Sequence, residues 1–187
     1  MKKLLRKLAP KQALSAYHFG LASFANAFYG RPSNKMIIIG VTGTKGKTST
    51  ANFTWAALQG AGHKVGLLST SVIRVGNKEI ANSYHMTMPG RFLLQQWLKK
   101  MYEAGCTHVV VETSSEGILQ WRHVGITYDI GIFTNLSPEH LASHNNSLDH
   151  YRKTKGRLFK AIANRKPKHI NGEIVKTMTL VNSDDPA

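Results

Sequence analysis

The chain has 187 residues, 42% of them hydrophobic, which suits a globular protein with one substantial core. Its 25 Lys and Arg residues against 10 acidic residues give a formal charge of +15, which favours anionic partners and not cationic ones. The single cysteine, Cys106, excludes an intramolecular disulfide, and no apolar run is long enough to predict a transmembrane helix.

The first predicted element is an amphipathic helix in residues 12–29. Five apolar residues recur there at steps of three and four and therefore share one helical face. They are Leu14, Tyr17, Leu21, Phe24 and Phe28. Twelve basic residues precede the first acidic one, Glu79, and seven of them lie in residues 1–35. Two interpretations stay open: residues 1–29 contact an anionic membrane from its inner face, or the helix packs on its own domain or on another part of the protein.

The N-terminus also resembles a signal peptide, because a basic start is followed by an apolar stretch. Gln12, Tyr17 and His18 dilute that stretch, so we reject a signal peptide and expect a cytoplasmic protein. A break at residues 30–33 separates a basic helical leader, residues 1–34, from a nucleotide-binding domain predicted for residues 35–187.

A glycine-rich segment follows an apolar run that starts at Ile37. It reads Gly40-Val41-Thr42-Gly43-Thr44-Lys45-Gly46-Lys47-Thr48-Ser49. A strand, a glycine-rich turn and a helix in this order are typical of a phosphate-binding loop, in which backbone N–H groups surround phosphate oxygens. We expect Lys47 to reach the terminal phosphates of ATP and the Thr48 hydroxyl to bind Mg²⁺. The nucleotide-binding residues predicted here are Gly43, Thr44, Lys45, Gly46, Lys47, Thr48 and Ser49.

The generic phosphate-loop pattern needs a glycine where this chain has Val41, whereas the shorter form Gly-Thr-x-Gly-Lys-Thr matches. That shorter form resembles the Mur ligases, ATP-dependent enzymes that join amino acids to the peptidoglycan precursor. Within the family the chain is most similar to the UDP-N-acetylmuramoyl-tripeptide synthetases. Folylpolyglutamate synthetases share the loop style, but they usually have Gly-Lys-Gly where this chain has Gly46-Lys47-Thr48.

Strands and helices alternate along the rest of the chain. We predict helices at 49–59, 91–104 and 148–163, strands at 64–70, 108–112, 128–134 and 177–182, and a hairpin at 71–80 that turns at Gly76-Asn77. This order predicts an α/β fold with a parallel sheet and helices on both faces, an incomplete P-loop central domain of the Mur ligase type. Ligands of such sheets bind at the carboxyl ends of the strands.

An acidic residue, Glu112, ends the apolar strand that contains Val109 to Val111. A buried carboxylate is costly unless it is paired or bound to a metal, and Mg²⁺ near Thr48 would be its partner. The resemblance likewise implies that Glu112 binds Mg²⁺ at the ATP phosphates. The family usually has His where this chain has Glu116, so the role of Glu116 stays open.

Further positions take roles from the resemblance alone. It implies that Ser114, Gln120 and Arg122 contact the muramoyl-peptide substrate, and that Thr87 touches the UDP-sugar. A guanidinium group such as that of Arg122 also suits a phosphate or a carboxylate on general grounds. As isolated residues these are weak signals, and their spacing relative to Glu112 strengthens them.

The segment that starts at Thr134 carries the last motif. The resemblance implies that Asn135 contributes to the nucleotide site, that His140 helps to bind a second Mg²⁺, and that Lys155 is carbamylated by CO₂. A carbamate turns a cation into an anion, which can hold Mg²⁺ where lysine would repel it. The alternative for Lys155 is an ordinary position in a basic helix, beside Lys153 and Arg157.

The resemblance covers residues 36–187, and parts that a full Mur ligase has are missing, so we expect a fragment whose own activity differs from that of the parent. The parent is expected to add an amino acid to a UDP-N-acetylmuramoyl-peptide through an acyl phosphate, using ATP and Mg²⁺. Its catalytic residues would be Lys47, Glu112, His140 and Lys155, and its metal ligands Thr48, Glu112, His140 and Lys155. One alternative is a Mur-like enzyme that acts on a lipid-linked precursor, and another is a non-catalytic nucleotide-binding or polyanion-binding module; no specific nucleic-acid partner is predicted.

Overall fold

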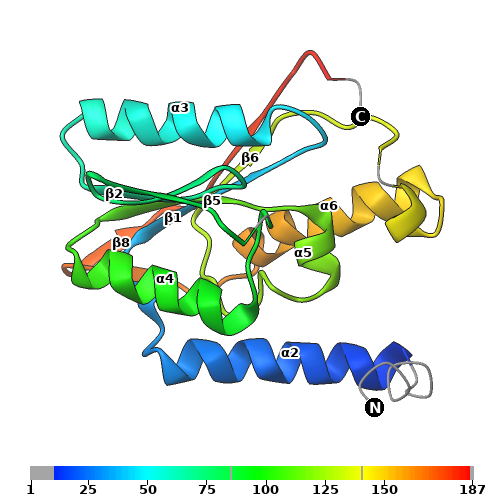
Figure 1. Cartoon of the computed structure of the whole chain (residues 1–187), viewed down its shortest axis with the longest axis horizontal. Helices are drawn as coiled ribbons and strands as arrows, with labels where there is room; N and C mark the ends of the chain where they lie inside the picture. The colour runs from blue at the N-terminus through cyan, green and yellow to red at the C-terminus, as the bar shows by residue number, and fades with distance from the viewer. Residues whose placement is uncertain (1–10, 85, 140, 186–187) are drawn as a thin grey trace.

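A central sheet of seven strands organises the molecule (Figure 1), and the computed structural model describes residues 11–84, 86–139 and 141–185. The elements in chain order are α2 (Lys11–Phe28), η1 (Pro32–Lys35), β1 (Ile37–Thr42), α3 (Lys47–Gly60), β2 (Val65–Leu68), β3 (Val72–Val75), β4 (Lys78–Ala81), α4 (Arg91–Glu103), β5 (His108–Glu112), α5 (Ser115–Leu119), β6 (Ile130–Phe133), η2 (Leu141–His144), α6 (Leu148–Ala163), β7 (Lys168–Ile170), β8 (Glu173–Val175) and β9 (Met178–Val181).

The strand order is β4-β3-β2-β5-β1-β6-β9. Strands β2, β5, β1, β6 and β9 are parallel, whereas β3 and β4 form an antiparallel hairpin at one edge. The predicted α/β fold and the predicted hairpin are therefore confirmed. The chain leaves β1 toward β2 on one side and later returns to β6 on the other, so the end of β1 lies at a point where the direction of winding reverses.

Helices cover both faces of the sheet, as predicted. Helix α3 lies on one face, and α4, α5 and α6 lie on the other (Figure 1). Each face has its own buried core, because successive residues of a buried strand point to opposite sides. In β1, Ile38 belongs to the core under α4 and α6, whereas Ile39 belongs to the core under α3.

Helix α2 lies outside these layers and packs against α4 (Figure 1). Its buried contacts come from the small residues Ala22 and Ala25. The aromatic residues of the predicted stripe are less covered: Tyr17, Phe24 and Phe28 are 60%, 60% and 66% exposed. The helix forms as predicted and packs on its own domain, where the ring centres of Phe24 and Phe28 lie 6.1 and 6.4 Å from that of Phe92 in α4. No helix in the described part of the chain is long and apolar enough to span a membrane.

Besides the short 3₁₀ helices η1 and η2, two further features were not predicted from the sequence. One is the short helix α5 directly after β5, and the other is the antiparallel pair β7–β8. The turn of that pair is Asn171-Gly172, with φ of 52° and 85°. An Asn-Gly dipeptide between two short apolar segments is a strong hairpin signal, so this element could have been found.

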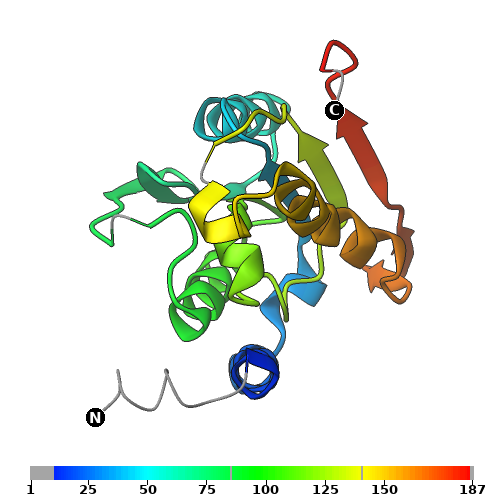
Figure 2. The ribbon, with the colours of Figure 1, turned by 90° about the vertical axis from the view of Figure 1, so that its right-hand side faces the viewer.

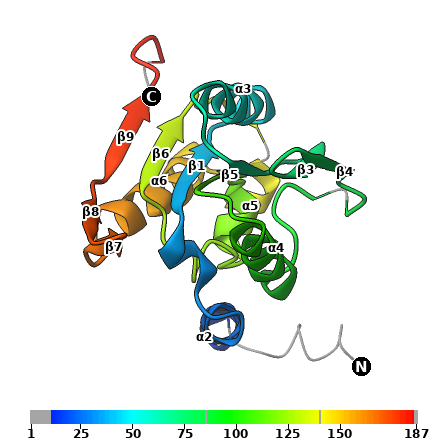
Figure 3. The ribbon, with the colours of Figure 1, turned by 90° about the vertical axis from the view of Figure 1, so that its left-hand side faces the viewer.

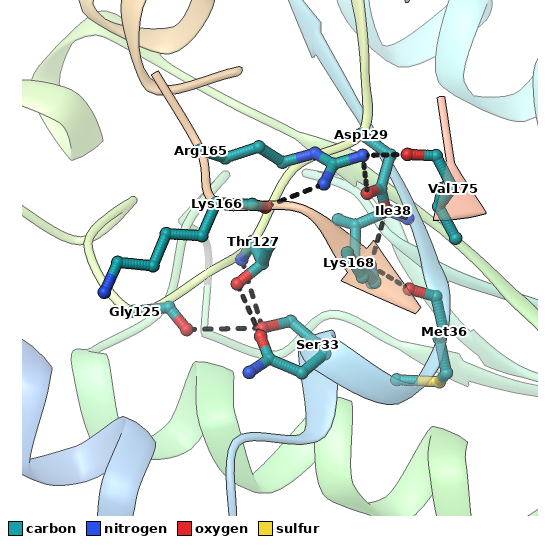
Figure 4. A network of polar contacts seen from close by, with 11 residues as sticks. Ser33, Met36, Ile38, Gly125, Thr127, Asp129, Arg165, Lys166, Lys168 and Val175 are labelled. Atoms are coloured by element: carbon teal, nitrogen blue, oxygen red, sulfur yellow. Dashed lines mark hydrogen bonds and ion pairs between the residues drawn. The ribbon is translucent and has the colours of Figure 1, made fainter. Parts of the chain in front are cut away.

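The amino ends of the strands are joined by a buried network around Asp129 (Figure 4). Its carboxylate accepts a hydrogen bond from the Ile38 N–H at 2.8 Å and one from Lys168 Nζ at 2.6 Å. Arg165 Nη2 lies 3.3 Å from the other carboxylate oxygen, and Lys168 also donates to the Met36 carbonyl. This network ties β1, β6, β7 and the end of α6 together at the end of the sheet opposite the predicted site.

Candidate active site

The predicted site lies at the carboxyl ends of β1, β5 and β6, the end of the sheet that faces the viewer in Figure 2. Parallel pairing places these strand ends side by side, so residues that are far apart in the sequence come together there. The loop between β1 and α3 is residues 43–46, and its last residue caps α3.

Two glycines give this loop its shape. Gly43 has φ of 151°, and a methyl group at that position would lie 1.9 Å from Thr134 Oγ1, so no larger residue fits. Gly46 has φ of 77° at the N-cap of α3, a left-handed conformation that favours glycine. Because glycine has no side chain to cap the helix, the first N–H groups of α3 stay available to an anion.

The loop is held from the other side by the segment that leaves β6. Asn135 Oδ1 accepts a hydrogen bond from the Lys45 N–H at 2.8 Å, and Asn135 Nδ2 donates to the Lys45 carbonyl at 3.2 Å. The Asn135 carbonyl accepts a hydrogen bond from the Thr44 N–H at 2.9 Å. Asn135 therefore fixes the backbone of the loop, and Ser49 lies in the first turn of α3 that follows it.

Thr48 and Glu112 meet where α3 begins and β5 ends. The Thr48 hydroxyl donates to Glu112 Oε1 at 3.0 Å, and the Thr70 N–H donates to Glu112 Oε2 at 2.8 Å. Glu112 is only 1% exposed, so two hard oxygen ligands lie next to each other in a largely buried place. A hydroxyl and a carboxylate are the kind of groups that hold Mg²⁺ together with phosphate oxygens and water.

The side chains of the described residues include no cluster of three or more His, Cys, Asp or Glu that could hold a metal. The Thr48–Glu112 pair fits a cation that takes its remaining ligands from a bound nucleotide and from water, which is how Mg²⁺ is commonly bound.

A cavity of about 330 Å³ is lined by Lys47, the residue before Thr48, and by Ser114, two residues after Glu112. It brings together two groups of predicted residues, the lysines of the nucleotide site and the residues assigned to the substrate. They are Lys47, Lys155, Thr87, Ser114, Gln120 and Arg122. Thr87 is also linked to the Glu112 region, because its hydroxyl lies 2.9 Å from the Thr70 hydroxyl.

Three of these residues make contacts that shape the cavity wall. Ser114 Oγ accepts a hydrogen bond from the Gly117 N–H at 3.1 Å and so caps α5. Arg122 donates to the Met88 carbonyl and, through Nη2, to Gln120 Oε1 at 2.7 Å. Partial burial lowers the pKa of Arg122. The contacts hold Arg122 and Gln120 at the surface of the cavity in a defined arrangement.

Two lysines lie at the boundary between the loop and the cavity. Lys47 Nζ donates to the Thr44 carbonyl at 2.8 Å, and burial lowers its pKa. Lys155 is 2% exposed, and its Nζ donates to the Gly43 carbonyl at 2.6 Å. Burial, with a smaller contribution from the charge of Lys47, lowers the pKa of Lys155 to about 7. A substantial part of the Lys155 population is therefore a neutral amine at physiological pH.

Tyr151 belongs to the same group, although the sequence analysis gave it no role. Its ring centre lies 4.3 Å from Lys155 Nζ, and its hydroxyl lies 3.4 Å from Thr44 Oγ1. Burial is the main cause of a raised pKa for Tyr151. Tyr151 and Lys155 are four residues apart and so share one face of α6, which is the signal that could have found it. The backbone N–H of Thr70 was missed as well, and a backbone contact has no signal in the sequence.

His140, predicted as a catalytic residue and metal ligand, lies outside the described residues. Its neighbour Glu139 forms an exposed ion pair with Lys45, at 3.1 Å between Oε1 and Nζ. Glu116, which stands where the resembling family has His, lines the cavity and accepts a hydrogen bond from the Ser143 hydroxyl at 2.9 Å.

The chain is similar to known proteins in sequence and in fold. The family model described as the Mur ligase middle domain matches residues 41–186. The chain is 38% identical over 172 residues to a UDP-N-acetylmuramyl-tripeptide synthetase of Roseiflexus sp. (strain RS-1), which covers 89% of this chain and 33% of that protein. It is 37% identical over 166 residues to a UDP-N-acetylmuramoyl-L-alanyl-D-glutamate--2,6-diaminopimelate ligase of Geobacillus kaustophilus, with 89% and 32% covered. The chain thus spans about a third of the length of these relatives.

Solved structures show the same fold. A UDP-N-acetylmuramoyl-L-alanyl-D-glutamate--2,6-diaminopimelate ligase superposes with a TM-score of 0.65 at 24% identity, over 81% of this chain and 28% of that one. A folylpolyglutamate synthase of Mycobacterium tuberculosis, solved with ADP and AMPPCP, also gives a TM-score of 0.65, at 17% identity over 87% of this chain and 41% of that one. At these identities the likeness concerns the fold alone.

Proposed function

The chain belongs to the Mur ligase family, and from that premise we propose that it is the nucleotide-binding part of an ATP-dependent amide ligase. The proposed reaction adds an amino acid to a UDP-N-acetylmuramoyl-peptide, the substrate class named for the relatives of about 37–38% identity. The observation that carries the proposal is the cavity in which Lys47 and Lys155 lie beside Thr87, Ser114, Gln120 and Arg122.

The loop is proposed to bind the phosphates of ATP. The N–H groups at the start of α3 and the Lys47 ammonium face the position where the β- and γ-phosphates would lie, and both favour negative charge. Their geometry is set before the nucleotide arrives, because Gly43 and Asn135 fix the loop. Positioning and electrostatic stabilisation are the main contributions a protein makes to phosphoryl transfer.

Thr48 and Glu112 are proposed to hold Mg²⁺, with His140 and a carbamylated Lys155 as ligands of a second ion. Bound Mg²⁺ would neutralise the phosphate oxygens. The step at Lys155 itself needs only this chain and CO₂. The neutral amine forms a bond to the carbon of CO₂, and its N–H proton passes to solvent, which leaves an anionic carbamate. The pKa of about 7 supports this role, because a lysine titrating near 10.5 would rarely be a nucleophile at neutral pH.

In the proposed reaction a substrate carboxylate attacks the γ-phosphorus of ATP, ADP leaves, and an acyl phosphate forms. The amine of the incoming amino acid then attacks the acyl carbon and gives up one proton to solvent, and inorganic phosphate leaves as the amide bond forms. Arg122 and Gln120, on the cavity wall, are placed to bind a phosphate or carboxylate of the substrate. The cavity lies next to the phosphate loop, so the two reactants would be held in contact.

Calorimetry with Mg²⁺ and ATP tests the nucleotide part of this proposal. We expect binding that requires Mg²⁺ and that weakens at least about tenfold in Lys47→Ala, a loss of about 1.4 kcal/mol. Lys99→Ala is the control, because Lys99 is an exposed cation on α4 away from the site. An equal loss in both variants would indicate binding by net charge alone. Binding of RNA without ATP affinity would support the polyanion-binding alternative.

Substrate choice is tested on the longest protein that contains this chain. We expect phosphate release that depends on both a UDP-N-acetylmuramoyl-peptide and an amino acid. Release that instead requires a lipid-linked precursor would favour the Mur-like alternative.

For Lys155, we expect a carbamate carbon signal in NMR spectra recorded with ¹³C-bicarbonate, and none in Lys155→Met. An identical spectrum for both proteins would contradict the carbamate.

A further inference from the structure

Helix α2 is a ridge on the outer side of α4, separated from the sheet by that helix (Figure 3). One side of α2, beside its contact with α4, is aromatic. Tyr17, Phe24 and Phe28 lie seven and four residues apart, a spacing that keeps them close to one side of the helix. They are 60–66% exposed, whereas single phenylalanines on a protein surface are usually better covered.

The phenylalanines continue into a cluster across two helices. The ring centres of Phe24 and Phe28 are 6.2 Å apart, and both lie near Phe92 of α4, at 6.1 and 6.4 Å. Tyr29 adjoins Phe28 at 5.2 Å. Phe24 and Phe28 are exposed, whereas Tyr29 and Phe92 are partly covered. Exposed rings that gather in one group mark an interaction surface and not ordinary surface variation. We call this group, with Tyr17, the aromatic patch.

The charge of α2 and of the sequence before it has one sign. Helix α2 contains no acidic residue, and none occurs before Glu79. Five basic residues lie at or just before the start of α2. They are Lys2, Lys3, Arg6, Lys7 and Lys11. Apolar rings on one helix and a run of cations next to them in the sequence match an anionic lipid surface, where the rings enter the interface and the cations pair with phosphate groups.

We propose that α2 is an interfacial helix that docks this protein on anionic phospholipid through the aromatic patch. The helix has 18 residues and would lie about 27 Å along the membrane plane. It is not apolar enough to cross a membrane. Insertion of the exposed rings explains their exposure in the isolated chain, and the basic residues supply the attraction that a short helix needs.

A second copy of the chain fits the aromatic patch less well, because each copy carries a formal charge of +15 and the copies would repel each other. The position of α2 also connects the membrane with the cavity. Trp121 Nε1 donates to Ser15 Oγ at 2.7 Å, and Phe19 contacts the Trp121 ring edge-on at 5.7 Å between centres. Trp121 lies between Gln120 and Arg122 of the cavity wall, so docking would hold the cavity beside the lipid surface.

Cosedimentation with vesicles tests the proposal. We expect the protein to bind vesicles that contain phosphatidylglycerol and not vesicles of phosphatidylcholine alone. Binding should weaken when NaCl rises from about 0.1 M to about 0.5 M, because the attraction is screened. In Phe24→Ser/Phe28→Ser we expect partitioning at least about tenfold weaker, since two rings no longer enter the interface. Both side chains are exposed, so the fold should survive, which circular dichroism checks.

Phe53→Ser is the matched control, because Phe53 is 74% exposed on α3, on the opposite face of the sheet. It should bind vesicles like the wild type. Tyr17→Ser provides a second, milder variant of the aromatic patch, with a smaller loss expected. Equal binding by the wild type and the double Phe variant would overturn the proposal in favour of attraction by charge alone. So would an absence of binding to anionic vesicles, or dimers in sedimentation that the double variant abolishes. None of these outcomes depends on ligase activity.

Discussion

A lysine is buried at each end of the sheet, and the two differ in whether a carboxylate compensates the charge. At the amino end, Lys168 Nζ lies 2.6 Å from the Asp129 carboxylate, with Arg165 on the other side of the same group (Figure 4). At the carboxyl end, the contacts of Lys155 in the described part of the chain are the Gly43 carbonyl and the Tyr151 ring. The charged group that affects its pKa is another cation, Lys47.

The lysine at the amino end stabilises the fold, whereas the lysine at the carboxyl end is available for chemistry. In a buried ion pair neither group has access to water. Removing one partner therefore leaves the other as a buried charge without a counter-charge, which is strongly destabilising. An uncompensated buried lysine instead reduces its cost by losing its proton, which makes the amine reactive. At the amino end the charges are compensated and stabilise the fold. At the carboxyl end the lysine can bind an anion or react as an amine.

The largest effect is expected from Asp129→Asn. This change leaves Arg165 and Lys168, which are 7% and 3% exposed, without a counter-charge. Removing one partner of a buried ion network typically costs about 3–5 kcal/mol. We expect a loss of that size in the free energy of unfolding, measured by urea denaturation.

Asp149→Asn is the matched control, because Asp149 pairs with Arg152 and Lys153 on the exposed side of α6. The midpoint of unfolding should stay close to that of the wild type. If Asp129→Asn were equally mild, the charges at the amino end would be solvated, and the contrast between the two ends would fail.

Lys168→Met and Lys155→Met compare the two lysines directly. We expect Lys168→Met to lose about 2–3 kcal/mol, less than Asp129→Asn, because Asp129 keeps Arg165 and the Ile38 N–H as partners. Lys155→Met should be stabilising at pH 7, because it removes an amine whose burial without a counter-charge opposes its protonation. Urea unfolding of both variants in one buffer measures the contrast. Equal losses would mean that Lys155 is paired in solution.

The pH dependence of stability sharpens the same comparison. The pKa of Lys155 is about 7 in the folded protein and near 10.5 in an unfolded chain, so between these values the unfolded state binds more protons. Stability contributed through Lys155 therefore rises with pH above about 7, by about 2 kcal/mol up to pH 9. Burial lowers the pKa of the half-buried His108 and of the buried His123 to about 4, so most of their effect on the stability falls below pH 7.

The difference in the free energy of unfolding between wild type and Lys155→Met gives the contribution of Lys155 alone, because the other lysines with a lowered pKa are present in both proteins. We expect the two stability curves to converge as pH rises from 7 to 9. Parallel curves over that range would show that Lys155 keeps its proton in the folded state.

Local signals explain which parts of this contrast could be predicted from the sequence. The periodic segment Leu148–Ala163 forms the helix predicted for residues 148–163, and the glycine-rich loop lies where the alternation of strands and helices places it. The partner of Lys168 could not be predicted in this way. Asp129 meets Lys168 through a separation of 39 residues, and a single acid before an apolar strand is a common pattern.

The same reasoning explains the site. Residues of one motif, such as those of the phosphate loop, share a backbone geometry and carry a strong signal. The low pKa of Lys155 depends instead on burial under the loop and on the proximity of Lys47, which only the assembled fold produces. The sequence could indicate Lys155 as a candidate residue, but its lowered pKa follows from the packing of the folded protein.

The smallest effect is expected from the ion pair that borders the loop. Lys45 Nζ lies 3.1 Å from Glu139 Oε1, but the side chains are 71% and 37% exposed, so water screens the attraction. We expect Glu139→Gln to change the free energy of unfolding by less than about 0.5 kcal/mol, measured by urea denaturation at low salt. The backbone of Lys45 is held separately by Asn135, so the loop should keep its shape. A loss comparable to that of Lys168→Met would mean that water does not screen this ion pair and that Glu139 stabilises the loop.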